Sequence, residues 1–439
     1  MSSNSKSTFI VDSRNNLSGT IRVPGDKSIS HRSIMLGSLA EGITEVSGFL
    51  QGEDNLATLN AFRAMGVKID GPDTEGHVRI HGVGINGLKK PHNDLDLGNS
   101  GTSMRLLAGL LSGQKFASIL TGDKSLNSRP MRRVTDPLAK MGSVIDTTES
   151  GTPPLSIHSN NKLNGIDFEM KVASAQVKSC LLLAGLYASG ETCVTEPAPT
   201  RDHTERMLEG FGYPIKREGS KVCVIGGGSL QASKINVPGD ISSAAFFMVG
   251  ASIALNSDIT LENVGINPTR TGVINILKAM GANINIKNER LAGGEPVADI
   301  RVQSAQLQGI DIPEEQVPLA IDEFPALFIA AACAQGKTVL SGAKELRVKE
   351  SDRIQVMADG LQALGVNAIP TEDGMIIHGG KIQGGKVDSH GDHRIAMSFA
   401  MSALRAEDSI TIDDCENVNT SFPGFVDIAR KAGLAVRLG

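Results

Sequence analysis

The hydrophobic positions of this chain predict two kinds of helix that alternate along it. The first kind is apolar nearly all round, as in "AAFFMVGASIAL", "ALFIAAACA" and "CLLLAGLYA". The second kind is amphipathic, as in "DRIQVMADGLQALG" and "TRTGVINILKAMG". A helix without a polar face must be buried on every side, whereas an amphipathic helix covers a surface. The pattern therefore predicts apolar helices at the centre of the fold.

The same plan of elements returns along the chain. The segment "IRVPGDKSISHRSIMLGSLAEGITEVSGF" and the later "INVPGDISSAAFFMVGASIALNSDITLENV" both read as a strand, an apolar helix and a strand. Four other segments follow this plan more loosely; they begin "LDLGNSGTSMR", "MKVASAQVK", "LAIDEFPAL" and "DSHGDHRIA". A glycine ends each amphipathic helix, and these glycines are Gly66, Gly142, Gly212, Gly281, Gly365 and Gly433. We infer six α/β units of roughly 70 residues.

The repeat also predicts the domain organisation. A chain of 439 residues is too long for one small core. The return of VPGD at 237–240 predicts one domain over residues 23–237, with units 1–3. Units 4–6 form a second domain over 238–439, and the N-terminal strand within 1–22 is expected to join it. Each domain then has three buried helices inside and sheets outside, rather than a doubly wound sheet.

Composition and charge narrow the classes of function. The net charge is −5, with no Trp and two Tyr, which disfavours nucleic-acid binding. No apolar run approaches membrane-spanning length, and "MSSNSKSTFI" lacks the apolar centre of a signal peptide, so we expect a cytoplasmic protein with no membrane partner. The cysteines form no CxxC pair and are expected to be reduced, mostly buried thiols. They are Cys180, Cys193, Cys223, Cys333 and Cys415.

Charged and hydroxyl residues gather where the buried helices begin. "VPGDKSISHR" places Lys27, Ser28 and Arg32 there, and "GNSGTSMR", "SAQVK" and "GDHR" repeat the arrangement. Cations at a helix N-terminus oppose the helix dipole. The twin segment "VPGDISSAAFF" has Ile241 and Phe246 at the positions of Lys27 and Arg32. We therefore predict that bound anions compensate these charges, at one shared site in a cleft between the domains.

Other interpretations of these motifs remain open. Any single Ser or Asp at a helix start could be an ordinary cap, and "DHR" could be a surface salt bridge. "SHGDH" is weak evidence for a metal site, and we predict neither a metal nor a cofactor. "GVGING" (82–87) matches a dinucleotide-binding pattern, but Pro91 follows where a helix is required, so we predict a turn. No P-loop sequence occurs.

The motifs together resemble the 5-enolpyruvylshikimate-3-phosphate (EPSP) synthase family over essentially the whole chain. They are "PGDKSISHR", "LGNSGTSMRLLAGLL", "SRPMRRV", "SAQVKSCLLLAG", "RVKESDR", "GDHRIAMSFA" and "SFPGF". The resemblance implies an inside-out α/β barrel of two domains, each with three βαβαββ units and its helices inside. It also implies transfer of the enolpyruvyl group of phosphoenolpyruvate to the 5-hydroxyl of shikimate 3-phosphate, with release of phosphate. The active site is expected in the cleft between the domains, without a cofactor, in a chain that acts as a monomer.

The resemblance also implies roles for individual residues. Those expected to bind shikimate 3-phosphate are Lys27, Ser28, Arg32, Ser174, Ala175, Gln176, Arg201, Asp322 and Lys349. Those expected to bind phosphoenolpyruvate are Lys27, Gly101, Arg129, Gln176, Arg353 and Arg394. Asp322 is the implied base, Glu350 the implied proton carrier at the phosphoenolpyruvate methylene, and Lys27 assists. The sequence does not divide the acid and base roles among these three residues.

The chain departs from the common family pattern at two positions. Ser100 stands where many members have Ala, and Thr420 stands where some have Lys. These departures leave its sensitivity to glyphosate open, although "IDEFP", "SAQVK" and "TRDHT" look closer to the less common class, often described as glyphosate-tolerant. One alternative function is enolpyruvyl transfer to UDP-N-acetylglucosamine, but that enzyme uses a loop cysteine and unit 2 has none. The other alternative is a non-catalytic repeat scaffold.

Overall fold

The computed structural model describes residues 7–13, 15–159, 162–292 and 294–439. The chain divides into two compact units. The central unit comprises Gly25–Val237 with Ala292–Glu295. The flanking unit comprises Met1–Pro24, Pro238–Leu291 and Pro296–Gly439. Residues 1–6, on which part of the signal-peptide prediction rests, lie outside the described residues.

The central unit contains three successive repeats. The first comprises α1 (Lys27–Leu39), β3 (Ala40–Ser47), α2 (Glu53–Ala64), β4 (Lys68–Asp70) and β5 (Val78–Val83). The second comprises β6 (Leu95–Asp96), α3 (Gly101–Ser112), β7 (Ser118–Thr121), η1 (Leu126–Ser128), α4 (Arg132–Lys140), β8 (Ile145–Asp146) and β9 (Leu155–Ile157). The third comprises β10 (Leu163–Asn164), β11 (Asp167–Glu169), α5 (Ala175–Gly185), β12 (Ala188–Ser189), β13 (Glu191–Thr195), α6 (His203–Gly210), β14 (Lys216–Glu218) and β15 (Lys221–Ile225). The short strands β16 (Leu230–Gln231) and β17 (Lys234–Asn236) return to β3 of the first repeat.

The flanking unit contains the other three repeats. The fourth comprises α7 (Ile241–Ile253), β18 (Asp258–Gly265), α8 (Gly272–Ala279), β19 (Asn283–Ala292) and β20 (Glu295–Gln303). The fifth comprises η2 (Glu314–Gln316), α9 (Val317–Ala320), α10 (Phe324–Cys333), β21 (Lys337–Leu340), η3 (Lys344–Val348), α11 (Arg353–Ala363), β22 (Asn367–Pro370) and β23 (Met375–His378). The sixth comprises β24 (Gly385–Asp388), α12 (His393–Ser402), η4 (Ala403–Arg405), β25 (Ile410–Asp413), α13 (Val418–Ser421), α14 (Phe425–Ala432) and β26 (Val436–Leu438). The N-terminal strands β1 (Phe9–Val11) and β2 (Ser18–Ile21) complete the sheets of the sixth and fourth repeats.

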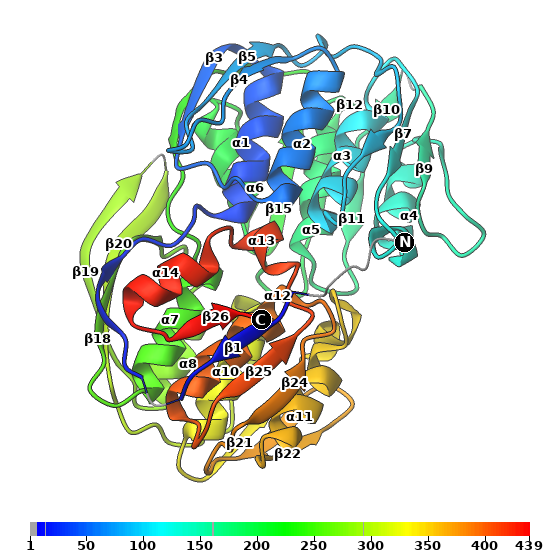
Figure 1. Cartoon of the computed structure of the whole chain (residues 1–439). Coiled ribbons are helices and arrows are strands. Elements are labelled where there is room, and N and C mark those ends of the chain that lie inside the picture. The colour runs from blue at the N-terminus through cyan, green and yellow to red at the C-terminus, as the bar shows by residue number, and fades with distance from the viewer. Residues whose placement is uncertain (1–6, 14, 160–161, 293) are drawn as a thin grey trace, which may run out of the picture. The chain divides into compact units, whose positions relative to one another are not determined.

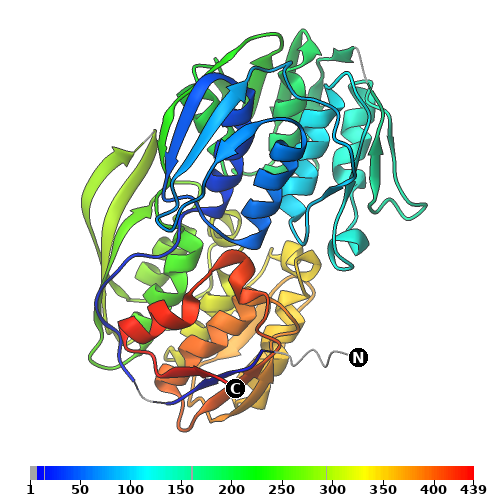
Figure 2. The ribbon, with the colours of Figure 1, turned by 45° about the horizontal axis from the view of Figure 1, so that its top comes forward.

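The apolar helices lie inside each unit, which confirms the fold class. All residues of α7 are buried, and α3, α5 and α10 are buried along nearly their whole length. In the central unit α3 packs against α5 and α1 packs against β5, and β3, β4 and β5 lie outside α1 (Figures 1 and 2). In the flanking unit α10 packs against both α7 and α12. The sheets are therefore the outer layer of each unit.

Among the described strands, the outer layer of each unit consists of separate sheets. The main sheets belong one to each repeat, with orders such as β6-β7-β9-β8 and β24-β25-β1-β26 among the described strands. The strands of one repeat pair with one another, with the N-terminal strands β1 and β2, or, in the first repeat, with β16 and β17. The helical core of each unit is thus surrounded by the separate main sheets of its three repeats.

The six glycines predicted to end the second helices do so in left-handed backbone. Their φ angles lie between 76° and 111°, a region that glycine enters without a steric penalty. After Gly212, for example, the amide of Tyr213 bonds back to the carbonyl of Leu208 in α6. The repeat marker found in the sequence is therefore a backbone requirement. The "GVGING" segment is also a turn, since the amide of Gly87 donates to the carbonyl of Gly84 and an irregular segment follows.

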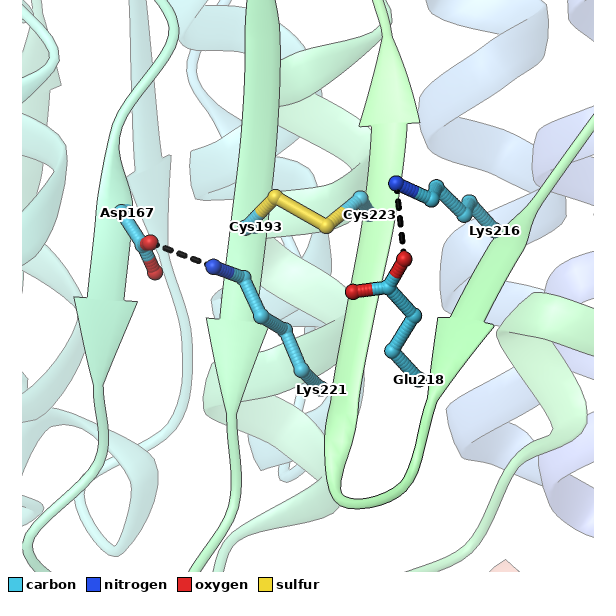
Figure 3. Close-up of a disulfide and its surroundings, with 6 residues drawn as sticks. All are labelled: Asp167, Cys193, Lys216, Glu218, Lys221 and Cys223. Carbon is cyan, nitrogen blue, oxygen red and sulfur yellow. Dashed lines mark hydrogen bonds and ion pairs between the residues drawn. A yellow bond between two sulfur atoms is a disulfide. The ribbon is translucent and has the colours of Figure 1, made fainter.

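Two of the five cysteines form a disulfide, so the prediction that all are free thiols is wrong for this pair. Cys193 on β13 lies directly opposite Cys223 on the antiparallel strand β15, and their sulfur atoms are bonded. Their neighbours Val194 and Val222 face the core, so the disulfide lies on the outer face of the sheet. There the ion pairs of Lys221 with Asp167 and of Lys216 with Glu218 flank it (Figure 3). Strand register, which spacing in the sequence does not show, brings the two sulfurs together.

The other three cysteines are thiols, as predicted. They are Cys180, Cys333 and Cys415. Burial raises the pKa of each thiol to about 12, so they stay protonated at neutral pH. Among the described residues, no helix combines the length and apolar character needed to cross a membrane.

Candidate functional site

The predicted site residues lie in both units, and each set is described within its own unit. The central half-site consists of Lys27, Ser28, Arg32, Gly101, Arg129, Ser174, Ala175, Gln176 and Arg201. The flanking half-site consists of Asp322, Lys349, Glu350, Arg353 and Arg394. Both sets gather at the starts of helices or in the segments that lead into them.

The start of α1 has its own cap and carries two cations as well. The carboxylate of Asp26 accepts the amide hydrogen of Ile29 at 2.9 Å, which is an ordinary N-cap. Lys27 forms an ion pair with Asp54, at the start of α2. Ser28 occupies the first turn and its carbonyl accepts a hydrogen bond from Arg32. Helix capping therefore explains the presence of Asp26. It does not explain the two cations, Lys27 and Arg32.

The Arg32 guanidinium is buried among neutral acceptors. It is 4% exposed and donates to the hydroxyls of Thr204 and Ser179, at 2.6 and 2.8 Å, and to the carbonyl of Ser28 at 3.0 Å. Burial lowers its pKa to about 10, although the nearby carboxylate of Glu205 acts in the opposite direction. An anion bound here would offset that desolvation.

A chain of polar side chains links α1, the middle of α2 and the start of α3 in the central unit. His31 of α1 bonds to the hydroxyl of Thr58 of α2 at 2.8 Å, which bonds to Ser103 of α3 at 2.6 Å. Ser103 in turn bonds to Ser100, the N-cap of α3. Burial, followed by the charges of Lys27 and Arg32, lowers the pKa of His31 well below its ordinary value. The imidazole is therefore neutral, as a buried hydrogen-bonded ring beside two cations should be.

Two guanidinium groups converge over Gly101, the first residue of α3. A Cβ atom on Gly101 would lie 3.0 Å from an Nη of Arg105 and 3.1 Å from an Nη of Arg129. Arg105 also donates to Gln176 at 2.6 Å, and Gln176 donates to Thr102 at 3.0 Å. A Cβ atom here would crowd both guanidinium groups, and the two cations lie together at a helix N-terminus.

The start of α5 and the segment before α6 complete the central half-site. Ser174 is the N-cap of α5, Ala175 is the first helical residue and Gln176 the second. Arg201 is half-buried just before α6, and its charge lowers the pKa of Arg32 slightly, since both are cations. All nine predicted residues of the central unit thus lie at the N-terminal ends of α1, α3 and α5 or in segments beside them.

Arg353 is the centre of the flanking half-site. It is 1% exposed and contacts three carboxylates: Asp392 at 2.8 Å, Asp322 at 3.3 Å and Glu350 at 2.5 Å. Burial lowers the pKa of Arg353, but the three carboxylates outweigh it, so its pKa is raised above the ordinary value. Arg353 therefore holds the acidic groups in place, and its predicted contact with phosphoenolpyruvate stays a prediction.

The remaining flanking residues surround this cluster. Lys349 Nζ lies 3.4 Å from Asp322, and Glu350 keeps about a third of its side chain exposed. Asp392 caps α12 by accepting the amide hydrogen of Arg394. Among the residues that the structure describes, none forms a hydrogen bond or an ion pair with the half-buried guanidinium of Arg394. Asp392, the acidic residue of "GDHR", is fully buried, so the interpretation of "DHR" as a surface salt bridge is wrong.

The twin helix start, at α7, is closed by the protein's own side chains. Asp240 caps α7 and accepts from Arg270 at 3.0 Å, and Arg270 also donates to Ser242 at 2.6 Å. Ser242 in turn donates to Glu323. The fourth repeat thus satisfies its helix start internally, whereas the first presents Lys27 and Arg32.

The two departures from the family pattern have local structural roles. Ser100 is buried and its hydroxyl accepts from the amide of Ser103, so it serves as a helix cap. Thr420 is buried in α13 and donates to the carbonyl of Asn417.

Among the described residues, the group placed to hold a metal ion is Glu191 with Cys193 and Cys223, whose sulfurs are bonded to each other.

Sequence reasoning missed several partners of the predicted residues. Thr204 and Ser179 hold Arg32, and Asp392 holds Arg353. The buried pairs of Lys178 with Glu196 and Glu205 were also missed. These partners are distant along the chain, and only the position of Asp392 inside "GDHR" offered a signal.

Comparisons with known proteins agree along the whole chain. The family model described as EPSP synthase (3-phosphoshikimate 1-carboxyvinyltransferase) matches residues 11–428. The chain is 69% identical to 3-phosphoshikimate 1-carboxyvinyltransferase of Methylococcus capsulatus, covering 96% of each chain. It is 67% identical to the enzyme of the same name from Nitrosococcus oceani, covering 98% of this chain and 97% of that one.

Solved structures show the same fold. An EPSP synthase structure from Acinetobacter baumannii has a TM-score of 0.90 at 61% identity and covers 99% of this chain and 100% of that one. The enolpyruvyl transferase NikO from Streptomyces tendae has a TM-score of 0.78 at 15% identity, over 99% of both chains, and shows the fold alone.

Proposed function

The chain belongs to the EPSP synthase family, and from that premise we propose that it is a 3-phosphoshikimate 1-carboxyvinyltransferase. It transfers the enolpyruvyl group of phosphoenolpyruvate to the 5-hydroxyl of shikimate 3-phosphate and releases phosphate. This reaction is a step of the shikimate pathway toward chorismate. Both substrates carry a phosphate and a carboxylate, so the enzyme must bind several negative charges.

Arg32 is the observation that carries the proposal. Its guanidinium is buried, donates only to neutral oxygens in its described hydrogen bonds, and has a pKa lowered to about 10. A buried cation in this state is receptive to a phosphate, which would supply charge-assisted hydrogen bonds. Ser28 in the first turn of α1, Ser174 at the N-cap of α5 and Arg201 before α6 are assigned to the same site for shikimate 3-phosphate.

Phosphoenolpyruvate is assigned to the charges around Gly101 and to the flanking half-site. Arg129 and the helix start at Gly101 offer a guanidinium and the partial positive charge of a helix N-terminus to a phosphate. Gln176 accepts a hydrogen bond from Arg105, which lies beside Gly101, and we assign Gln176 to both substrates. Arg394, with a half-buried guanidinium, and Arg353 would hold the rest of the molecule. Lys27, placed at the start of α1, is assigned to both substrates.

The reaction we propose is an addition followed by an elimination. Asp322 takes the proton of the 5-hydroxyl while that oxygen bonds to C2 of phosphoenolpyruvate, and Glu350 gives a proton to the methylene carbon. The resulting tetrahedral intermediate loses a methyl proton and phosphate, which restores the double bond. Asp322 and Glu350 both contact Arg353, which fixes the two carboxylates relative to one another. Lys27 assists the proton transfers.

An assay of phosphate release tests the function. With phosphoenolpyruvate and shikimate 3-phosphate together, the enzyme should release phosphate, and with either alone it should not. Arg32→Met should abolish release at ordinary substrate concentrations. Release that requires UDP-N-acetylglucosamine instead, or no release with any acceptor, would overturn the proposal.

We further propose that the enzyme acts as a monomer in the cytoplasm. Sedimentation of the active enzyme at assay concentration checks the first point, and fractionation of its source cells checks the second. The substrates are the small molecules named above, and no nucleic acid or membrane is assigned as a partner.

A further inference from the structure

Lys178 is a buried lysine that the proposed mechanism does not use. It lies in α5, one turn after Ser174, and is 1% exposed. Its Nζ lies 2.8 Å from Glu205 and 3.0 Å from Glu196. The same nitrogen lies 3.5 Å from the carbonyl oxygen of Thr200. A lysine at this depth is retained in its charged form only if its charge is paired.

Glu196, one partner of Lys178, lies at the beginning of the segment that leads to Arg201. Glu196 directly follows β13, and its amide donates to the carbonyl of Ser220, which fixes where the segment begins. Its carboxylate also accepts the hydroxyl of Thr200 at 2.6 Å. Thr200 is the residue before Arg201. Lys178 thus reaches both ends of residues 196–200, through Glu196 and through the carbonyl of Thr200.

The second partner lies beside the residues that hold Arg32. Glu205 is in the first turn of α6, next to Thr204, whose hydroxyl accepts from Arg32. Both carboxylate oxygens of Glu205 are buried without a described hydrogen-bond partner, so the ion pair with Lys178 is what compensates their burial. Removing Lys178 would leave two buried acids uncompensated at the two places where substrate-binding arginines are set.

We propose that Lys178 is a positioning residue for shikimate 3-phosphate. It ties the start of α5 to the 196–202 segment and to α6, and so fixes Arg201 and Arg32 relative to Ser174. This rests on the proposed function, because it assumes that these residues bind that substrate. Lys178 is too deeply buried to contact substrate, so it acts through the residues it holds.

The phosphoenolpyruvate residues are held by other contacts. Gln176 is tied to Arg105 and Thr102 of α3, and Arg129 donates to Asn99 at 2.6 Å. None of these described bonds passes through Lys178. Loss of Lys178 should therefore weaken binding of one substrate much more than binding of the other.

The experiment measures the dissociation constant of shikimate 3-phosphate by titration calorimetry, which suits a chain without tryptophan. Lys178→Met should raise this constant about 10- to 100-fold, as expected for loss of hydrogen bonds that involve charged groups. The KM for phosphoenolpyruvate should change less than about threefold. The matched control is Lys216→Met, which removes an exposed lysine from its pair with Glu218 in the same unit and should leave both constants unchanged.

A second variant separates positioning from folding. Lys178→Met with Glu196→Gln and Glu205→Gln removes the buried charges while keeping the side-chain sizes, so it should fold more stably than Lys178→Met alone. Its dissociation constant for shikimate 3-phosphate should still be raised. Wild-type affinity in this folded variant would overturn the proposal, and so would equal losses for the two substrates.

A double-mutant cycle tests the route through Arg201. If Lys178 acts through Arg201, Lys178→Met should add less than about threefold in the background of Arg201→Ala. Full additivity would overturn that route. Failure of the wild-type enzyme to bind shikimate 3-phosphate at all would refute the proposed function instead, so the two failures are distinguishable.

Discussion

At the scale of single residues, the same side-chain chemistry performs different tasks according to its surroundings. Arg32 and Arg353 are both buried guanidinium groups, yet one donates to neutral oxygens and the other is surrounded by three carboxylates. The first is suited to receive a phosphate, and the second to hold acids in place. The sequence shows two arginines, and only their partners assign the roles.

Glu350 tests the assignment of the proton carrier. Glu350→Gln keeps the size of the side chain beside Arg353 but cannot deliver the proton. We expect kcat to fall about 10²- to 10⁴-fold, with the dissociation constant of shikimate 3-phosphate changed less than threefold. Rapid-quench turnover and calorimetry measure the two quantities. Equal losses in both would rule out this role.

His31 predicts how stability depends on pH. Its pKa in the folded state is lowered well below 6.5, so the unfolded chain binds a proton that the folded one refuses. Stability is therefore lost as pH falls below about 6.5, with a loss of about 1.4 kcal/mol from this residue between pH 7.5 and 5.5. Urea unfolding of the wild type and of His31→Gln at both pH values measures the difference. An equal pH effect in both proteins would contradict the assignment.

At the scale of elements, the repeat was predictable and the strand register was not. The six glycines and the alternation of helix types predicted the inside-out units, because both follow from local backbone and burial rules. The same rules predicted that Lys27, Ser28 and Arg32 lie at the start of a buried helix, which is α1. The pairing of β13 with β15 depends on how a whole sheet assembles, so Cys193 and Cys223 were read as separate thiols.

The disulfide should stabilise the central unit against unfolding. It links residues 30 apart in sequence and restricts the unfolded chain, for which the chain-entropy model gives about 3–4 kcal/mol. Cys193→Ser with Cys223→Ser should lose about that much in urea unfolding, and reduction of the wild type should have the same effect. The double variant itself should not respond to reductant. A wild type insensitive to reductant would show that the bond is not formed in solution.

At the scale of the whole molecule, the residues expected to bind shikimate 3-phosphate divide unequally between the two units. Seven of the nine residues expected to bind shikimate 3-phosphate belong to the central unit, and Asp322 and Lys349 belong to the flanking unit. The sequence predicted both groups from motifs. It could not predict the buried pairs behind them, such as Lys178 with Glu205, because neither partner has a local signature.

This division predicts where ligand protection appears. Shikimate 3-phosphate at 100 times its dissociation constant stabilises the form that binds it by about 2.7 kcal/mol. Hydrogen exchange should slow most in α1, α5 and the start of α6, and in the flanking unit only near Asp322 and Lys349. Inorganic sulfate at the same concentration is the control and should give weaker protection. Protection centred on α7 would contradict the placement of the site.

The pairing of the first strand with the last would allow the order of the segments along the chain to be changed by circular permutation. β1 runs antiparallel to β26, with Phe9 opposite Leu438, so the beginning of β1 and the end of β26 lie side by side in one sheet. A short linker would close the chain into a ring, and the ring could be opened between Pro24 and Gly25. In that permuted gene, residues 25–237 come first and the rest follows without interruption. The crossing between Pro24 and Gly25 would disappear, and the central unit apart from Ala292–Glu295 would be encoded by a single stretch of DNA.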